Sequence, residues 1–485
     1  MRTKSSEPQT KECRTCVLRR IRCDGTLPHC KKCIKKDTQC PGYGQHIRWV
    51  NAIASRGRFK GLGKPEQPKL ADPAPRTTYG SPRSPLGFIP LDSSESACSS
   101  GTESVLGLLP ESDQDQLLQY YSSNIAPINV WFDSPQNGYK QLVIPLARRQ
   151  SALRLAILGI SAAHSSDDLE IDKSFSQLAC HTAMTTITSQ IKILVGRELG
   201  KFDIQAVQDA EVLPAVLATM LVLSNYSLLE SDISLAKIHL QAIRVLIRTP
   251  MLNNECNGDL TSFLRNQIAS YDVLTCTTLF DPEHIRNAIV PGIKPKPVIF
   301  NDYLNIIHDI TMRSVGEVAQ ESNQGFSLSK IETQLELARG SSLLAGGPLS
   351  TQCTQSSYRD FIRLTESFHH AGFLYACKRL PYLAEAREIQ EYHVSKLFSV
   401  FSQFEDMHFS VVRLSWPIFV GGICSCGHTE RMGIITALCR TLSKSRFRFY
   451  DSVLVFLEEH WASQDQDWIS RAQEWERRGT PLVVV

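Results

Sequence analysis

The sequence predicts a mainly α-helical protein in which a small N-terminal module, built from two pseudo-symmetric short helices, is linked to a large all-α domain. Three observations predict this fold class. Six cysteines near the N-terminus repeat one spacing, a segment rich in Pro, Gly and Ser follows, and the rest of the 485 residues shows apolar residues at helical spacing. The predicted divisions are a disordered N-terminus over 1–10, the cysteine module over 11–45, a linker over 46–105 and the helical domain over 106–485.

The cysteines of the N-terminal module form the half C-x2-C-x6-C twice, 17 residues apart. Two thiolates separated by two residues can bind one ion, at about 2.3 Å each for zinc, whereas a cytosolic or nuclear chain has no lasting use for disulfides. The pattern therefore predicts a zinc site, and so short a segment needs the metal in order to fold. The predicted ligands are Cys13, Cys16, Cys23, Cys30, Cys33 and Cys40.

Six sulfur atoms are too few for two separate four-ligand sites, so we expect two zinc ions that share two thiolates. The repeat makes Cys13 equivalent to Cys30, and this pair is predicted to bridge the ions. In the alternative, His29 and His46 complete the two sites, although His29 adjoins Cys30 and would point away from the ion that Cys30 binds. The shared arrangement gives one ion the ligands Cys13, Cys16, Cys23 and Cys30, and the other ion Cys13, Cys30, Cys33 and Cys40.

The two halves of the module differ in their basic residues. Arg19, Arg20 and Arg22 lie between the second and third cysteines of the first half. Arginine matches the O6 and N7 edge of guanine with two hydrogen bonds, so the first half is predicted to read bases. The lysines of the second half are predicted to bind phosphates, which orients a protein on DNA without sequence information, and a plainly solvated position is an equal alternative for each. These lysines are Lys31, Lys32, Lys35 and Lys36.

Positive charge is concentrated in this part of the chain. Residues 11–60 carry 13 Lys and Arg against three acidic residues, a balance of +10, while the whole chain is only +3. Such a patch favours double-stranded DNA as the partner, because contacts with phosphates make binding electrostatic and sensitive to salt. A membrane surface would also attract the charge, but no amphipathic helix or lipidation signal accompanies it.

The run 13–33, which reads CRTCVLRRIRCDGTLPHCKKC, resembles the binuclear zinc cluster of fungal Zn2Cys6 transcription regulators. The resemblance implies that the residues after the second cysteine form a helix that enters the major groove. It also implies that basic residues at the positions of Arg19 and Arg20 contact a CGG triplet. Pro28 lies where that family has the proline that shapes the turn between the halves, whereas Val17 lies where many members have Arg or Lys.

Residues 61–104 are predicted to be a flexible linker, since Pro, Gly and Ser make up 20 of these 44 positions. Seven of the 20 are prolines, which exclude the long heptad coiled coil that many relatives place here to dimerise. Two modes of DNA binding are therefore open. The protein binds one triplet as a monomer, or it forms a homodimer through the helical domain.

Beyond residue 105, apolar spacing and capping residues predict helices almost throughout. One helix is expected to be capped at Ser112, and another starts at Ser151 and is largely buried. The longest apolar run, Val212 to Leu223, has 12 residues, fewer than the 18 or more of a membrane span, so a soluble protein without membrane association is expected. The other predicted helices cover about 173–196, 212–228, 231–248, 259–280, 300–320, 327–340, 356–378, 383–407, 428–445 and 449–462.

Four segments of this region, 119–127, 131–135, 152–164 and 270–278, resemble the helical regulatory domain found downstream of such clusters in fungal regulators. The resemblance implies a domain that recruits or restrains the transcription machinery or co-regulators. The whole chain is then expected to be a nuclear, sequence-specific regulator of RNA polymerase II genes. It would be specific to one pathway, such as secondary metabolism.

No enzyme is expected, because the chain has no nucleophile elbow, phosphate-binding Gly-rich loop or His-Glu-x-x-His helix. His164 and His181 fit buried core positions better than catalytic ones. Cys424 and Cys426 form a C-x-C close to His428, and buried thiols are favoured over a metal or redox site. Core positions are also predicted for Cys180, Cys276, Cys377 and Cys439. The alternative function is a nuclear adaptor, independent of nucleic acid, whose zinc cluster binds an acidic protein surface.

Overall fold

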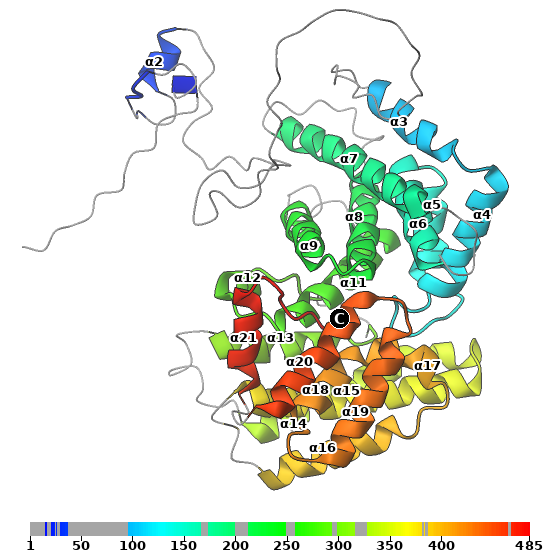
Figure 1. Ribbon diagram of the computed structural model, residues 1–485, viewed down its shortest axis with the longest axis vertical. Helices are drawn as coiled ribbons and strands as arrows, with labels where there is room; N and C mark the ends of the chain where they lie inside the picture. Colours follow the sequence, from blue (N-terminus) through cyan, green and yellow to red (C-terminus); the bar gives the residue numbers. More distant parts are fainter. Residues whose placement is uncertain are drawn as a thin grey trace, which may run out of the picture. The chain divides into compact units, whose positions relative to one another are not determined.

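A computed structural model of the chain describes residues 15–16, 21–24, 26, 30–36, 96–165, 173–198, 212–248, 258–292, 298–315, 327–380, 383, 387–463 and 467–485. The chain divides into two compact units, Met1–Phe88 and Ile89–Val485 (Figure 1). Every regular element within the described residues is helical, which confirms the mainly α-helical fold class.

In the first unit, Thr15 and Cys16 are helical, and α2 covers Lys31–Ile34. The side chain of Cys30 caps α2, because its Sγ accepts the backbone N–H of Cys33 at 3.3 Å. Cys16 and Cys33 hold equivalent positions in the cysteine repeat. Each half of the module therefore has helical backbone at its second cysteine, as the predicted pseudo-symmetry requires.

The second unit consists of helices of very different lengths. Two segments, Tyr121–Ile125 and Tyr139–Val143, are π-helical, and 3-10 turns cover Gly347–Thr351, Val411–Leu414 and Arg448–Tyr450. The α-helices are α3 (Ser96–Leu106), α4 (Glu111–Tyr120), α5 (Ile144–Ala147), α6 (Ser151–His164), α7 (Lys173–Glu198), α8 (Val212–Leu229), α9 (Ile233–Ile247), α11 (Asp259–Cys276), α12 (Pro282–Arg286), α13 (Asn301–Val315), α14 (Leu328–Gly346), α15 (Gln355–Arg379), α16 (Arg387–Phe401), α17 (Met407–Ser410), α18 (Ser415–Ile423), α19 (Thr429–Ser443), α20 (Asp451–Ala462) and α21 (Trp468–Arg477).

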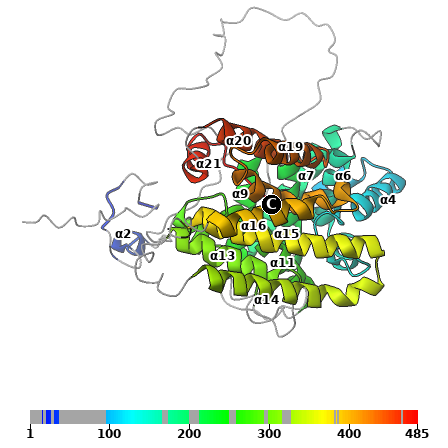
Figure 2. The same ribbon diagram turned by 90° about the horizontal axis from the view of Figure 1, so that it is seen from below.

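These helices pack as two connected groups. In the first group, α6 packs against α7 and α8, and α8 packs against α9 (Figure 1). In the second group, α14, α15 and α16 lie side by side, and α15 also contacts α18 (Figure 2). α11 joins the groups, because it contacts α8 and α9 as well as α13. One continuous apolar core runs through both groups.

An aromatic cluster occupies the core beside α15. The ring of Phe368 lies 4.8 Å from that of Phe300 and 5.4 Å from that of Trp416, and the ring of Trp131 stacks on Phe300 at 4.6 Å. Phe368 lies on α15 and Trp416 on α18, Phe300 directly precedes α13, and Trp131 lies between the two π-helical segments. Large aromatic side chains bury more apolar surface than any other residues, so this cluster fixes α15 and α18 against the rest of the domain.

Residues 480–485 form no regular secondary structure, and most of them are buried in the helical domain. Leu482 and Val484 are fully buried. The hydroxyl of Thr278, just after α11, donates to the carbonyl of Leu482 at 2.7 Å, and the hydroxyls of Ser415 and Tyr450 donate to that of Val485 at 2.8 and 3.0 Å. Side-chain donors from three parts of the fold thus satisfy the backbone of this segment.

α8 corrects an expectation about apolar length. Its 18 residues have a mean hydropathy of 1.8, so by length and composition it could cross a membrane. The apolar run Val212 to Leu223 is shorter than the helix, and Leu228 and Leu229 keep the mean over all 18 residues at 1.8 despite the polar residues at 224–227. Because 89% of the helix is buried inside the protein, it is a core helix here, and one such helix is weak support for a membrane span.

Among the described α-helices of nine or more residues, three lie where none was predicted. α3 begins at Ser96, inside the range predicted as linker, and it packs against α6 and α7. α18 and α21 were also missed. α18 is apolar on every side, with a mixture of Pro, Gly and aromatic residues that gives no helical period. α4 begins at Glu111 with Pro110 as its N-cap, so Ser112 lies in the first turn and does not cap the helix.

Candidate metal centre

The thiols of the N-terminal module converge in the structure. Cys16, Cys30 and Cys33 are fully buried, and the partly buried Ile21 and Cys23 pack against them. The Sγ of Cys16 lies 3.6 Å from that of Cys30 and 4.0 Å from that of Cys33. Two sulfur ligands at about 2.3 Å from one tetrahedral zinc ion lie roughly 3.8 Å apart. The spacing of the thiols therefore fits zinc.

Three of the four ligands predicted for one zinc ion come together. The sulfur atoms of Cys16, Cys23 and Cys30 all lie within 4.8 Å of one another. The fourth predicted ligand, Cys13, lies outside the described residues, as does Cys40 of the other predicted site. The bridging role of Cys13 and Cys30 stays a prediction, and so does the number of ions. His29 and His46 of the alternative also lie outside the described residues.

Asp24, which was not among the predicted site residues, fixes the start of the second half of the module. Its carboxylate accepts the backbone N–H groups of Lys31 and Lys32 at 3.1 and 3.0 Å, at the start of α2. It also accepts the side chain and the backbone N–H of Thr26 at 2.5 and 3.1 Å. The hydrogen bond from the Thr26 side chain, with those from the backbone, holds the pKa of Asp24 well below its usual value. The sequence Asp-Gly-Thr, which is typical of a turn and directly follows a predicted ligand cysteine, could have identified Asp24.

The basic residues of the module differ in their surroundings. The ammonium of Lys32 donates to the carbonyl of Arg22 at 2.6 Å and so ties the two halves together in this conformation. Arg19 and Arg20, which are predicted to read bases, lie outside the described residues. The basic side chains of the described part are exposed beside the thiol cluster, where they can meet a polyanion; they are Arg22, Lys31, Lys32, Lys35 and Lys36.

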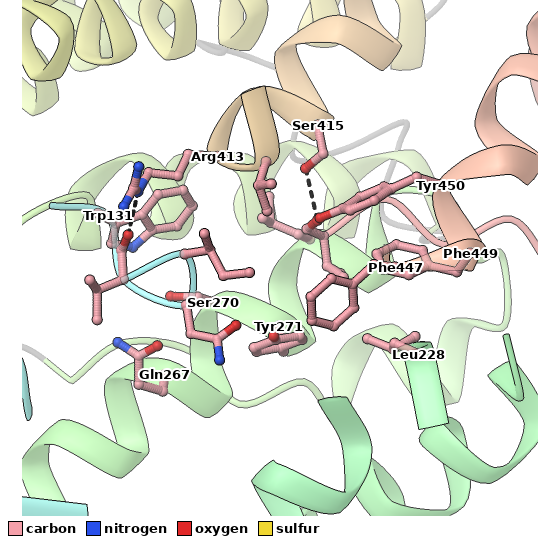
Figure 3. Close-up of a pocket in the computed structure, with 16 residues that line it drawn as sticks. Trp131, Leu228, Gln267, Ser270, Tyr271, Arg413, Ser415, Phe447, Phe449 and Tyr450 are labelled. Carbon is pink, nitrogen blue, oxygen red and sulfur yellow. Dashed lines mark hydrogen bonds between the residues drawn. The ribbon is translucent and has the colours of Figure 1, made fainter. Parts of the chain in front are cut away.

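The helical domain contains a pocket of about 660 Å³ of empty space, part of which is open to solvent (Figure 3). Trp131, Tyr271 and Phe447 line it. Arg413 also faces it, but the Arg413 Nε donates to the carbonyl of Val130 at 2.6 Å, and burial lowers the Arg413 pKa to about 10. Among the residues that the structure describes, no Asp, Glu, His, Lys or Cys lines the pocket. The polar side chains that line it carry hydroxyls, amides and one guanidinium.

Two histidines were expected in the core, and one of them is there. His164 is buried, with Nδ1 3.0 Å from the hydroxyl of Tyr120 and Nε2 3.2 Å from the carbonyl of Ser445, which confirms the expectation. For His181 the expectation was wrong, because the side chain is exposed on α7. The small apolar residues around it pack on the other faces of the helix.

The cysteines of the helical domain behave as thiols. Burial raises the pKa of Cys424 to about 11 and also raises that of Cys426, so neither is a thiolate at neutral pH. Neither belongs to a group of potential metal ligands among the described residues. The four cysteines predicted in core positions are all buried, as expected; they are Cys180, Cys276, Cys377 and Cys439.

Comparison with known proteins gives two family matches. Residues 116–477 match the fungal specific transcription factor domain, and residues 11–49 match the fungal Zn(2)-Cys(6) binuclear cluster domain. An uncharacterized transcriptional regulatory protein of Schizosaccharomyces pombe is 28% identical over 185 residues, which cover 38% of this chain and 29% of that protein. The acriflavine sensitivity control protein of Neurospora crassa is 46% identical over 42 residues, 9% of this chain and 7% of that protein.

The chain thus aligns with less than a third of the length of either curated relative. No solved structure matches the chain.

Proposed function

The chain belongs to the fungal transcription factors that join a Zn(2)-Cys(6) cluster to a fungal-specific helical domain, and on this basis we propose that it is a sequence-specific DNA-binding regulator of RNA polymerase II genes. The observation that carries the proposal is the gathering of Cys16, Cys23 and Cys30 within 4.8 Å, next to exposed basic side chains. A module this small depends on bound metal to fold, and its positive charge favours a polyanion as the partner. The nucleus is the compartment that this role requires.

The six cysteines would hold two zinc ions, with Cys13 and Cys30 shared between them. Bound zinc would supply the cross-links that fix the fold of the module. The 3.6 Å separation between the sulfur atoms of Cys16 and Cys30 supports their binding to one ion. Asp24 supports the site from outside, because it fixes the backbone that leads from Cys30 into α2.

DNA would be read by the first half of the module and held by the second half. Arg19, Arg20 and Arg22 are proposed to contact the base edges of a CGG-type triplet, and the lysines of the second half to contact phosphates. Lys32 donates to the carbonyl of Arg22, so it would exchange this hydrogen bond for one to a phosphate or keep a structural role. Phosphate contacts would then depend chiefly on the exposed lysines Lys31, Lys35 and Lys36.

The second unit would act as the regulatory part of the protein. We assign residues 1–10 to an N-terminal tail, 11–45 to the DNA-binding module and 46–95 to the linker. The regulatory domain then starts at α3, with Ser96, and not at residue 106 as predicted. α3 supports the change, because it packs against α6 and α7. This domain would recruit or restrain the transcription machinery or co-regulators, form the contact of any homodimer and serve one pathway.

Selection of bound duplexes from a random DNA pool tests the proposal, using the zinc-loaded full-length chain. We expect one enriched CGG-type triplet, or two at fixed spacing if the protein dimerises. Cys23→Ser removes a predicted ligand and should abolish enrichment, whereas Cys353→Ser, a matched change in the connection between α14 and α15, should leave it intact. Folded, zinc-loaded protein that enriches no sequence would reject the proposal and favour the nuclear adaptor.

A further inference from the structure

Three buried histidines meet between α15 and α16. His369 and His370 are consecutive residues of α15, and His393 lies on α16, which packs alongside (Figure 2). One ring nitrogen from each of the three lies within 4.8 Å of one from each of the others. The three residues are only 8%, 7% and 1% exposed, so the cluster is enclosed by the helical domain. This histidine cluster belongs to the second unit of the chain and shares no residue with the cysteine module.

The nitrogen atoms of the histidine cluster are placed as ligands would be. Nδ1 of His370 lies 3.0 Å from Nδ1 of His393. Two imidazole ligands at about 2.0–2.1 Å from a tetrahedral zinc ion have their nitrogen atoms roughly 3.3–3.4 Å apart. A shift of a few tenths of an ångström would thus admit an ion between these two rings. The ring centroid of His369 lies 5.0 Å from that of His370 and 6.0 Å from that of His393, within reach of the same ion.

Hydrogen bonding within the protein accounts for the cluster only in part. Without an ion, the Nδ1 atoms of His370 and His393 share one hydrogen bond. Nδ1 of His369 is buried and has no hydrogen-bond partner among the described residues, and a buried polar atom without a partner needs a reason. The ring of His393 also stacks on Phe373 at 4.0 Å, which holds its plane fixed. A fixed, enclosed set of imidazoles is what a metal site requires and what a hydrophobic core alone would avoid.

From this geometry we propose that His369, His370 and His393 bind one divalent transition-metal ion, with zinc as the ion that three imidazoles and an enclosed site favour. Imidazole is a common ligand of zinc, copper and nickel, whereas calcium and magnesium prefer oxygen. Three protein ligands leave the fourth position of a tetrahedral ion to a water molecule or a carboxylate. The site is separate from the cysteine cluster, so it adds an ion to whatever number the cysteines hold.

One feature beside the histidine cluster suits a bound cation. Oε2 of Glu336, on α14, lies 3.9 Å from Nδ1 of His369 and brings a carboxylate to the edge of the cluster.

Charged groups of both signs lie around the cluster. Glu336 lies near His369, and Arg339 donates to Glu336 at 2.9 Å and to Glu366 at 2.6 Å. The ammonium of Lys396 lies 5.5 Å from the ring of Tyr392 on α16. An ion in this position would tie α16 to α15 directly beside Phe368, and so couple its occupancy to the aromatic core of the helical domain.

The test uses the full-length chain loaded with ¹¹³Cd²⁺, whose NMR shift separates cadmium bound by thiolates from cadmium bound by nitrogen and oxygen. We expect a nitrogen-type resonance in the wild type, its loss in His393→Gln, and its retention in His460→Gln, which changes another buried histidine of the same domain. Zinc content measured by mass spectrometry should fall by one ion per chain in His393→Gln alone.

Each outcome bears on the proposal. If His393→Gln does not fold, the wild-type spectrum still decides. A saturated wild-type chain without a nitrogen-type resonance would overturn the inference. Persistence of that resonance in folded His393→Gln would also overturn it, because the nitrogen-bound cadmium would then lie elsewhere. Loss of thiolate resonances would concern the cysteine module and leave this inference standing.

Discussion

Arg244 on α9 and Asp272 on α11 form a buried ion pair in which the Nε of Arg244 lies 3.0 and 2.8 Å from the two carboxylate oxygens. Both side chains are nearly inaccessible to solvent. Asp272 also accepts the backbone N–H of Ile289 at 2.6 Å, and Arg244 donates to the carbonyl of His284 at 3.0 Å. The pair thus fixes the loop after α12 against the helix that joins the two groups of the domain.

Removal of one partner of this pair should strongly destabilise the helical domain. Asp272→Ala leaves the arginine charge buried without its carboxylate, and we expect a loss of about 3–5 kcal/mol in the free energy of unfolding. Arg244→Met combined with Asp272→Leu removes both charges and should recover much of that loss. Urea unfolding followed by circular dichroism measures both variants. If the double variant is no more stable than Asp272→Ala, the explanation by an uncompensated charge is wrong.

Base reading and phosphate binding should separate by mutation. Arg20→Ala should cost about 1–3 kcal/mol on a CGG duplex and little on a scrambled one, because a base contact discriminates between sequences. Lys31→Ala should weaken binding to both duplexes by the same factor and reduce the dependence of binding on salt. Fluorescence anisotropy at several salt concentrations measures both effects. Equal loss of discrimination in the two variants would contradict the assigned roles.

Asp24 should prove necessary for tight metal binding although it is not expected to be a ligand. Asp24→Ala removes the acceptor that fixes the start of α2 next to Cys30, and we expect zinc affinity to fall on the order of tenfold. Asp24→Asn keeps one acceptor oxygen and should lose less. Competition with a zinc-binding dye gives the affinities, and Lys36→Ala serves as the control for a change of charge. Unchanged affinity in Asp24→Ala would mean that α2 forms without this carboxylate.

Acid should destabilise the helical domain partly through His239. Burial lowers the pKa of this side chain from 6.5 to about 4, although Asp232 at the start of α9 acts in the opposite direction. The unfolded state therefore takes up the proton first. The contribution of His239 is complete above about pH 6.5 and is lost as the pH falls toward 4, up to about 3 kcal/mol at roughly 1.4 kcal/mol per pKa unit.

Unfolding free energies measured between pH 7 and pH 4 test this contribution. His239→Gln should reduce the slope of the unfolding free energy against pH by an amount that corresponds to close to one proton. His181→Gln, which changes an exposed histidine, should leave this slope unchanged. The same slope in the wild type and in His239→Gln would show that His239 does not couple to folding.

The same substitution at two glycines should have opposite effects. A Cβ at Gly159 in α6 would lie 2.5 Å from the Sγ of Cys180 and 3.2 Å from the carbonyl oxygen of Ser176, where α7 crosses closely. Gly159→Ala should therefore cost about 1–3 kcal/mol. Gly340, exposed in the middle of α14, has nothing within 4 Å of its Cβ position, and Gly340→Ala should stabilise the helix by about 0.5–1 kcal/mol. Thermal unfolding should show a lower Tm for the first variant and a higher Tm for the second.

Helix prediction worked where helices have one apolar face. α9, α13 and α20 begin and end within a few residues of their predicted positions, except that α13 is described only as far as Val315. α18 was missed because all nine of its side chains are buried, so no polar face marks a period. α3 was missed because it follows a Pro-rich stretch, and its helical state depends on packing against α6 and α7. The enclosed α8 was predicted at 212–228 from its long apolar run, whereas the short α18 has neither a polar face nor such a run.

By itself, the sequence predicted the six cysteine ligands, of which the structure brings Cys16, Cys23 and Cys30 together, and it determined the location of positive charge and the helical class of the second unit. These depend on spacing and composition within short stretches of chain. Only the tertiary structure decided that Arg244 pairs with Asp272 and that His393 joins His369 and His370. Consecutive residues of a helix point about 100° apart, so His369 and His370 carry no ligand spacing of their own. Their meeting with His393 follows from the packing of α16 on α15, which the burial of apolar side chains fixes across both helices.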